Sequence, residues 1–426
     1  MSERHSTMAP RSAARRTSAI LGAVALLGTT GLTAAHADSA PSPKAPGLYG
    51  TADPKFDGVF RQSLAFLAQN AAGVSPAPEA VDWLAGQQCA DGGYPGFRAD
   101  TGKPCDAQKG EFTDNTAAAV QALAAVGGRG EQVKKGLDWL TAHQNADGGW
   151  GMGPGENSNA NSTATAIGAL AAAGKDPARI TAKSGKSPYD ALLTFQLGCD
   201  AKADDQGAFG WAPQNGQLTA DNSASAASSL AALGKGYLVP AAGKDNKPVQ
   251  PLDCKQGKAA KDPQAAASAA AAYLVKKLDA TGDHLESSMP GAPKGPDFGV
   301  TADAVTALAA GGHREAAAKP LKWLESKDAK AVQWAKGDSG QGDPGRLAKL
   351  VLAVHAAGGD PGDFAGTDLV AQLNATGPKP ASTPAQQEEK KKEKGTTFGV
   401  WWFVGVCLVA GIGVGFLLSG RKKKQP

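Results

Sequence analysis

The 426-residue sequence predicts an all-α fold class, a closed (α/α)6 toroid of helical hairpins, with an N-terminal signal peptide and one C-terminal transmembrane helix. Three observations predict it. Similar segments recur, with Trp83, Trp139 and Phe195 evenly spaced 56 residues apart. The two helices of each repeated hairpin differ, because the first carries charged residues beside its apolar stripe and the second carries few or none, as in 162–173. Uncharged apolar runs lie near both ends of the chain, each beside basic residues. Such a regular period is typical of a repeat architecture.

Residues 1–37 are predicted to be a secretory signal peptide. A basic segment ends at Arg16, an apolar run extends from Ala19 to Leu32, and Ala35-His36-Ala37 forms a small-x-small cleavage site. This order of basic, apolar and small residues is typical of exported proteins. We expect residues 38–54 to be a disordered segment that precedes the folded body.

The body, residues 55–375, contains five predicted helical hairpins and one unmatched helix at each end. These two end helices, Phe56 to Gln69 and Phe364 to Leu373, bring the total to twelve and supply a sixth pair if the ends meet. An uncharged helix such as 162–173 needs cover on most sides. Charged helices outside and uncharged helices inside therefore predict two concentric rings.

The boundaries of the inner helices are marked by their first and last residues. Asp114, Asn161 and Asp221 open three of the uncharged runs, where an N-cap is expected. Each run ends in glycine, which suits a helix C-terminus: Gly127, Gly174 and Gly234.

A glutamine-aspartate-glycine-glycine-aromatic motif follows the first helix of the early repeats, as at 144–150. It resembles the QW repeat of squalene cyclases and of protein prenyltransferase β-subunits, and the same toroid occurs in the cobalamin carriers intrinsic factor and transcobalamin. The resemblance is strong over 79–234 and faint over 262–375, where residues 296–300 are its only remnant. A structural role is expected for the motif residues Gln88, Asp91, Gly92, Gly93, Tyr94, Gln144, Asp147, Gly148, Gly149, Trp150 and Trp211.

The catalytic residues that the resemblance implies are missing. Squalene cyclases use an Asp-x-Asp-Asp acid, whereas Asp204-Asp205 lacks the preceding Asp-x. Prenyltransferases bind zinc through Asp, Cys and His, but Cys89 and Asp91 have the reversed spacing, and a zinc site needs three or four ligands. We therefore assign no catalytic residue and no metal, and the question of enzymatic activity stays open with catalysis disfavoured.

A ring of polar residues is the candidate ligand site. In a toroid the inner helices begin at the same end, so their first residues converge there. These rim residues are Thr113, Asp114, Asn115, Asn161, Ser162, Asp221, Asn222, Thr301 and Asp303. Each alone also suits a simple N-cap. The resemblance to the cobalamin carriers, in which a similar helix start faces the corrinoid, makes a corrinoid the favoured ligand, although the carriers' second β-rich domain has no counterpart here.

Four cysteines lie in the exported part of the chain and allow three pairings. Because each sequential pair falls within one repeat, we expect the disulfides Cys89–Cys105 and Cys199–Cys254. Free buried thiols are the alternative. Disulfides are typical of oxidising compartments, which agrees with export.

The C-terminal region predicts a membrane anchor. Residues 376–397 are polar and are expected to form a disordered stalk. Residues 398–418 carry no charge and are long enough to span a bilayer, and the tail 419–426 contains a basic cluster that favours the cytoplasmic side. We expect a single-pass protein of the cell membrane with an extracellular body; attachment to the cell wall through 373–377 is less favoured, because that segment lies too far from the apolar run.

Charge and motifs leave three classes of function. The net charge of +4 arises at the two ends and the body is mildly acidic, which disfavours nucleic-acid binding because that requires a basic face. The leading hypothesis is a toroid that captures a bulky small molecule for a transporter in the same membrane. The alternatives are a terpenoid or isoprenoid enzyme of cyclase or prenyltransferase type, and a structural or partner-binding surface protein.

Overall fold

The computed structural model describes residues 46–106, 110–255, 257, 259–260, 262–288, 291, 294–337 and 340–383. All of these belong to one compact unit that begins at Pro43. The predicted signal peptide (1–37), membrane span (398–418) and tail (419–426) lie outside the described residues. Within the described part, no helix combines the length and apolar character needed to cross a bilayer.

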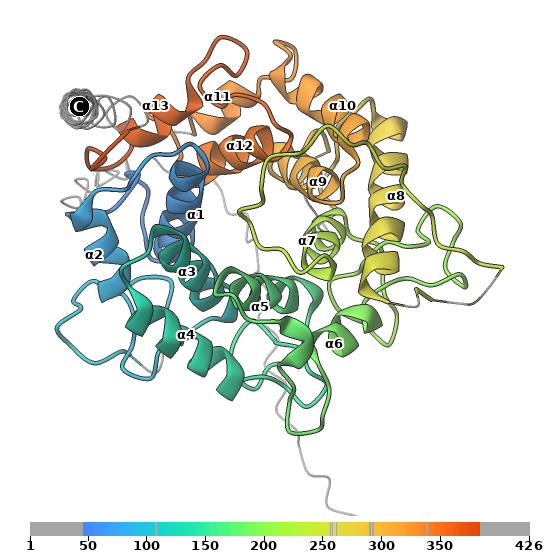
Figure 1. Cartoon of the computed structure of the whole chain (residues 1–426), viewed down its shortest axis with the longest axis horizontal. Coiled ribbons are helices and arrows are strands. Elements are labelled where there is room, and N and C mark those ends of the chain that lie inside the picture. Colours follow the sequence, from blue (N-terminus) through green and yellow to red (C-terminus); the bar gives the residue numbers. More distant parts are fainter. Residues whose placement is uncertain are drawn as a thin grey trace, which may run out of the picture. The chain divides into compact units, whose positions relative to one another are not determined.

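The described residues form two concentric rings of helices, with isolated β-bridges in place of strands. The inner ring consists of α1 (Gly58–Ala71), α3 (Thr113–Val126), α5 (Ala160–Ala172), α7 (Asn222–Ala232), α9 (Phe298–Ala310) and α12 (Pro344–Ala356). The outer ring consists of α2 (Pro78–Gly86), α4 (Gly130–Ala142), α6 (Pro188–Thr194), α8 (Pro263–Thr281), α10 (Arg314–Glu325) and α13 (Leu369–Ala375). Each inner helix packs on the next, and α12 packs on α1, which closes the ring (Figure 1). The predicted toroid of six helix pairs is confirmed.

Two short helices interrupt the connections between these layers and have no counterpart in the sequence-based prediction. They are η1 (Pro177–Arg179), which precedes α6, and α11 (Ala331–Ala335), which precedes α12. The predicted last helix also begins later than expected, at Leu369, because Phe364 and Thr367 form a tight turn in which Ala365 has a φ of 52°.

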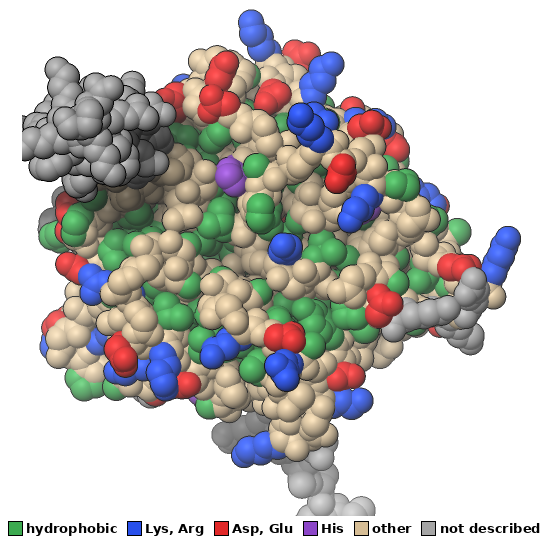
Figure 2. All heavy atoms as spheres, viewed as in Figure 1, with side chains coloured by type: hydrophobic (Ala, Val, Ile, Leu, Met, Phe, Trp, Pro, Cys, Tyr) green, Lys and Arg blue, Asp and Glu red, His purple; other side chains and the backbone are tan. Residues whose placement is uncertain are grey.

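The two rings differ in composition as the sequence predicts. In α5 every residue from Ser162 to Leu170 is buried, and alanines allow its neighbours to approach closely. In α4 the charged side chains point outward and Trp139 and Leu140 are buried. On the face seen in Figure 2, charged side chains lie mostly toward the periphery, and hydrophobic and uncharged atoms fill much of the middle. Hydrophobic burial between the rings therefore stabilises the toroid.

The first turns of α3 and α5 differ from the sequence-based prediction. The N-cap of α5 is Asn159, whose side chain accepts a hydrogen bond from the Ser162 N–H, and α3 has no side-chain cap. Asp114 and Asn161, which we expected to be caps, are the second residues of their helices and cap nothing. Asp221 does cap α7, by accepting from the Ala224 N–H. The glycines at the ends of these helices all have positive φ, as predicted: Gly127, Gly174 and Gly234.

A backbone hydrogen bond recurs in five repeats and anchors the start of each inner helix. The N–H just before the inner helix donates to the carbonyl of the residue in the aromatic position of the motif. The five pairs are Phe112 to Tyr94, Asn159 to Trp150, Asp221 to Phe209, Asp297 to Leu285 and Asp343 to Ala335. We call this bond the repeat tie. It is present even where the sequence motif is lost.

The repeat tie corrects two assignments made from the sequence. Phe209, which is fully buried, occupies the aromatic position of the third repeat, while Trp211 is 44% exposed. Residues 296–300 are not a remnant of the motif, because they form the start of α9 with Asp297 as its N-cap. Leu285 holds the motif position of that repeat instead.

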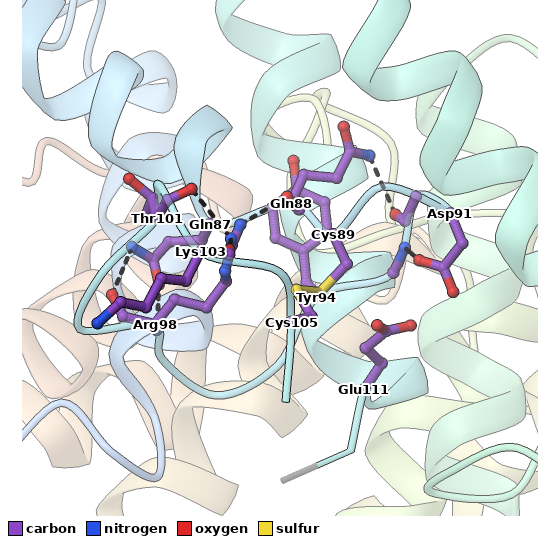
Figure 3. The surroundings of a disulfide bond; sticks show 12 residues. Gln87, Gln88, Cys89, Asp91, Tyr94, Arg98, Thr101, Lys103, Cys105 and Glu111 are labelled. Atoms are coloured by element: carbon purple, nitrogen blue, oxygen red, sulfur yellow. Dashed lines mark hydrogen bonds between the residues drawn. A yellow bond between two sulfur atoms is a disulfide. The ribbon is translucent and has the colours of Figure 1, made fainter. Parts of the chain in front are cut away.

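Both expected disulfides are present, with Cα–Cα distances of 5.7 Å for Cys89–Cys105 and 5.5 Å for Cys199–Cys254. Figure 3 shows the first, in the loop that follows α2. The guanidinium group of Arg98 supports this loop by donating to four backbone carbonyls. The loop is therefore fixed by one covalent bond and by the hydrogen bonds of Arg98.

The ordered body extends beyond its predicted limits at both ends. Tyr49 is buried, and its N–H donates to Gln62 of α1 (2.9 Å). The Gly50 N–H donates to the carbonyl of Thr376, and Ser75 pairs with Ser382. The prediction that 38–54 is disordered is therefore wrong over residues 46–54, and the predicted stalk is ordered up to 383. These contacts join the two ends of the chain where the ring closes.

A long connection after α7 crosses the end of the ring at which the inner helices finish. We call residues 235–247 the crossing loop. Its Tyr237 N–H donates to Gln121 of α3 (2.9 Å), its Ala242 N–H to the last carbonyl of α12, and its Lys247 N–H to Gly312 beyond α9. Figure 1 shows this yellow-green segment over the middle of the ring. The crossing loop therefore provides the floor of the lumen.

Candidate functional site

A cavity of about 350 Å³ occupies the lumen between the first turns of the inner helices and the crossing loop. Phe56, just before α1, lines the cavity and is 88% exposed, so the cavity reaches solvent at the end where the inner helices begin. Tyr237 lies at the opposite, closed end. This is the position that the sequence predicts for a ligand site.

Two residues on the α3 and α5 side of the cavity each have a side-chain oxygen that is shielded from solvent and has no hydrogen-bond donor. Asp114 accepts one hydrogen bond, from the Ser162 hydroxyl to its Oδ2 (3.2 Å), while its Oδ1 has no partner. The Oδ1 of Asn161 also has none. The hydroxyl of Thr165 donates to the Asn161 backbone carbonyl (2.9 Å), so it supplies no proton to either group. We call Asp114 and Asn161 the acceptor wall.

The buried environment of Asp114 makes its carboxyl group a weaker acid than an exposed aspartate. Burial raises the pKa of this carboxyl from its usual value near 3.8 to about 6, and the hydrogen bond from the Ser162 hydroxyl opposes the shift. Desolvation disfavours a charge that has no counter-ion nearby. Among the described residues Asp114 takes part in no ion pair. At neutral pH it is therefore a largely ionised carboxylate that lacks a positively charged partner.

The other carboxylates of the cavity are paired with cations. On the opposite side, Asp303 of α9 forms an ion pair with Lys349 of α12. At the mouth, Asp57 forms an ion pair with Arg61 of α1 (2.8 Å). When Asp114 is ionised, the groups at the cavity thus carry one uncompensated negative charge.

The remaining walls are apolar. They are formed mainly by α1, α7 and α12, through Phe60, Leu64, Ala226, Ala227, Leu230 and Leu352. The ring of Phe60 packs edge-to-face on Tyr237, with centroids 6.0 Å apart. The Tyr237 hydroxyl donates to Thr165 Oγ1 (3.3 Å), and burial, with Asp114 and Asp303 nearby, raises the Tyr237 pKa well above its usual range. The cavity therefore offers a polar side and an apolar side to one ligand.

Four of the nine rim residues line this cavity: Asp114, Asn115, Asn161 and Asp303. The other five take part in the framework. Ser162 holds Asp114, and Thr113 is buried at the start of α3. Asp221 caps α7 and accepts from the Ser288 hydroxyl (2.9 Å). Asn222 donates to the carbonyl of Glu286, and Thr301 accepts from the Leu285 N–H.

Sequence reasoning missed several residues of the cavity. Lys349 is a charged residue with apolar neighbours on both sides in an inner helix, and that contrast was a usable signal. Tyr237 lies in a connection with no periodicity, so no local pattern indicates that it enters the lumen. The position of Phe56 also differs from expectation, because α1 begins at Gly58 and leaves this side chain at the mouth.

The motif residues support the fold and none of them lines the cavity. Gln88 donates to the carbonyls of Gly92 (3.0 Å) and Gln132 (2.8 Å), which links the turn to the next outer helix. Gly148 has a φ of +93°, and a Cβ there would lie 2.2 Å from the Ser187 carbonyl oxygen. Trp150 is fully buried and donates from Nε1 to the Leu140 carbonyl (2.7 Å). The expected structural role of the motif agrees with these contacts.

One group of side chains has the spacing of a metal site. Cys89, Cys105 and Glu111 offer ligand atoms within 4.8 Å of one another. Both sulfur atoms are bonded in the disulfide, so Glu111 alone remains, as Figure 3 shows. Its carboxylate accepts from Trp139 Nε1 (2.8 Å), and burial and the neighbouring Asp91 raise its pKa. In the oxidised protein this cluster therefore does not provide a set of metal ligands.

Comparison with solved structures finds similar chains at low sequence identity. A protein from Actinoplanes is 14% identical, with a TM-score of 0.42, over 74% of this chain and 95% of that one. A glycosidase variant is 15% identical, with a TM-score of 0.44, over 74% and 92%. A sugar epimerase from a ruminal bacterium is 14% identical, with a TM-score of 0.42, over 74% and 93%. No curated protein sequence matches the chain.

Comparison with protein families gives one match. Residues 62–160 match the model described as the squalene-hopene cyclase C-terminal domain. This segment extends from α1 to the start of α5 and contains the two complete motifs at 88–94 and 144–150. The closed double ring shows that the described residues form an α/α toroid, and its segment 62–160 is similar to the squalene-hopene cyclase C-terminal domain.

Proposed function

We propose that this chain is a membrane-anchored extracellular toroid that captures a small molecule in its central cavity, without transforming it, for a transporter in the same membrane. The observation that carries the proposal is a solvent-connected cavity with apolar walls and unpartnered acceptors. Few convergent polar groups in a largely apolar pocket are typical of ligand sites. The two disulfides agree with an extracellular location, and the uncharged run 398–418 is the basis for the anchor.

The size of the cavity limits the ligand. Its volume of about 350 Å³ lies near the lower end of the range of roughly 300–1,000 Å³ for pockets that enclose drug-sized molecules. A corrinoid with its side chains is larger than such molecules, so it would have to bind across the mouth and leave the cavity largely unfilled. We therefore favour a smaller ligand than the corrinoid that the sequence resemblance suggested.

Acid catalysis is the second candidate function, and one observation favours it. A carboxyl with a pKa of about 6 in an apolar cavity, as at Asp114, is suited to general-acid chemistry near neutral pH. This would make the chain an isoprenoid or terpenoid enzyme. The two functions differ in one measurable respect, since a capture protein releases its ligand unchanged.

The test uses a variant that fills the cavity. Ala227 of α7 lines the cavity, so Ala227→Phe reduces its volume, whereas Ala142→Phe places the same side chain on the exposed end of α4 as a matched control. The full chain is incubated with a metabolite extract, washed and analysed by native mass spectrometry. We expect the wild type and Ala142→Phe to retain a small molecule that Ala227→Phe does not retain.

Two results would change the assignment. If Ala227→Phe keeps its circular dichroism spectrum and retains the same molecule, the cavity is not the capture site. If the retained molecule is converted with time, and Asp114→Asn stops the conversion, the chain is an enzyme.

A further inference from the structure

The acceptor wall determines which chemical groups complement the cavity. An ionised carboxylate accepts hydrogen bonds and donates none, so the free Oδ1 of Asp114 requires a donor from the ligand. The Oδ1 of Asn161, in the neighbouring helix, lacks a donor as well. A shielded acceptor without a partner is costly for the protein. A ligand that brings N–H or O–H donors removes this cost on binding.

The charges around the lumen determine the sign of the ligand. The groups that face Asp114 are the Asp57–Arg61 pair from the α1 side, Tyr237 from the crossing loop, and the Asp303–Lys349 pair from α9 and α12. Both pairs are neutral overall, and Tyr237 stays protonated because its pKa is raised. The α5 residues in contact with Asp114 do not titrate, and the cavity residues of α7 are uncharged. One positive charge on the ligand would therefore neutralise the site.

The apolar walls determine the rest of the ligand. Phe60, Leu64 and Leu230 cover the side of the cavity that lacks acceptors. Phe56 is exposed at the mouth and Tyr237 lies at the floor. Aromatic faces attract cations as well as apolar groups. An organic body next to the charged group would bury these surfaces.

We propose that the captured ligand is a protonated primary or secondary amine with a compact apolar body, whose N–H groups donate to Asp114 Oδ1 and Asn161 Oδ1. This inference rests on the proposed capture function and specifies its ligand class. It distinguishes a protonated amine from a quaternary ammonium ion, which has the same charge but no N–H to donate. It also distinguishes the amine from alcohols, which donate but carry no charge.

Four probes with the same phenyl body separate charge from hydrogen bonding. They are 2-phenylethylammonium, its trimethylammonium analogue, 2-phenylethanol and 3-phenylpropanoate. Isothermal titration calorimetry on the full chain at pH 7.5 measures their dissociation constants. We expect the primary ammonium to bind most tightly, the trimethylammonium ion and the alcohol more weakly, and the carboxylate not at all.

Two variants assign the effect to Asp114. Asp114→Asn keeps the shape of the side chain and removes its charge, while Asp138→Asn makes the same change on the exposed face of α4. Loss of a charge-assisted hydrogen bond should weaken binding of the primary ammonium about ten- to hundredfold in Asp114→Asn, and Asp138→Asn should leave it unchanged. Binding of 2-phenylethanol, which carries no charge, should weaken less than that of the ammonium in Asp114→Asn and should not change in Asp138→Asn.

The pH dependence gives a readout that a merely structural role of Asp114 would not produce. Asp114 is ionised above its pKa of about 6 and neutral below it, while the amine stays protonated throughout. Between pH 7.5 and pH 5 the wild type should lose about tenfold in affinity for the primary ammonium. Asp114→Asn should show no such change.

The outcomes distinguish this inference from the proposed function. If 2-phenylethanol or the carboxylate binds as tightly as the ammonium, or if Asp114→Asn binds the ammonium like the wild type, the ligand is not an amine, although the cavity still captures a molecule. If no probe binds and no molecule is retained from the extract, both proposals are wrong.

Discussion

The two halves of the toroid have the same architecture, although only the first has the sequence motif. In the first half the buried aromatic residues Tyr94, Trp150 and Phe209 occupy the motif position. In the second half this position holds Leu285 and Ala335. The repeat tie is nevertheless present in all five repeats. The comparison shows that the hairpin depends on a backbone hydrogen bond that several side chains tolerate, so the motif can disappear while the fold persists.

The second half has a cluster of aromatic residues near the outside of its hairpins. His284 and Phe298 both stack on Trp323, and Phe298 also contacts Trp334. These rings are only partly buried. Aromatic packing therefore stabilises both halves, at the centre of each hairpin in the first half and near the surface in the second.

The halves also differ at the cavity. The first half supplies the unpaired Asp114 and Asn161, and the second supplies the paired Asp303 and Lys349. A ring of related hairpins has thus produced two unlike walls. The two sides of the cavity therefore differ in charge pairing.

The largest expected effect tests the packing difference. Trp150→Ala removes a fully buried side chain and should destabilise the protein by about 3–5 kcal/mol, because a cavity remains where the ring was. Trp323→Ala in the second half should cost clearly less, because its ring is partly exposed. Urea denaturation measures both free energies of unfolding. Equal losses would show that the two halves do not differ in this way.

The two disulfides close loops of different length, so their contributions to the free energy of unfolding can be compared. Cys199–Cys254 joins residues 55 apart in sequence, and Cys89–Cys105 joins residues 16 apart. Loop-closure entropy predicts about 4 kcal/mol for the longer loop and about 3 kcal/mol for the shorter one. Replacing each pair with alanine should therefore lower the stability more for Cys199 and Cys254. The reverse order would mean that native contacts, rather than loop length, dominate.

The charge difference between the cavity walls predicts a pH-dependent stability. The folded-state pKa of Asp114 is raised to about 6, so this residue favours folding only while it is protonated, and the stability it supports is lost as the pH rises from about 4 to about 6. At pH 7.5 without ligand, Asp114→Asn should be more stable than the wild type by about 2–3 kcal/mol. The difference should vanish at pH 4. Thermal unfolding at both pH values measures it, with Asp138→Asn as the control.

The smallest expected effect sharpens the assignment of the aromatic position in the third repeat. Trp211→Ala should change the free energy of unfolding by less than about 0.5 kcal/mol, because surface substitutions rarely do more. Phe209→Ala should cost about 3–5 kcal/mol, because Phe209 is fully buried. A larger loss for Trp211→Ala than for Phe209→Ala would restore the assignment made from the sequence.

Much of the fold could be predicted because its signals are local. The period of the repeat, the uncharged inner helices and the glycines that end them are each visible in short segments, and both disulfides follow from the repeat boundaries. The segment 46–54 was misjudged because its order depends on Gln62 and Thr376, far along the chain. Pro320 lies inside α10, which begins at Arg314, so this proline does not mark the start of its helix.

The candidate site was predicted in position but not in composition. The convergence of inner-helix starts located the cavity, and Asp114, Asn115, Asn161 and Asp303 line it. Neighbouring residues of a helix point about 100° apart, since a turn takes about 3.6 residues, so Thr113 and Asp114 have different environments that the sequence does not distinguish.

The sequence by itself determined the closed double ring. Helices that carry charged residues alternate with helices that carry few or none, and a closed inner ring covers the latter on most sides. Only the tertiary structure decided the chemistry of the lumen. The rotation of each inner helix selects which polar side chain faces inward, and the crossing loop brings Tyr237 to the floor through contacts with α3 that are distant in sequence. Burial then leaves Asp114 without a cation. A shifted pKa and an unpartnered oxygen are properties of that enclosed environment, which forms only when the ring closes.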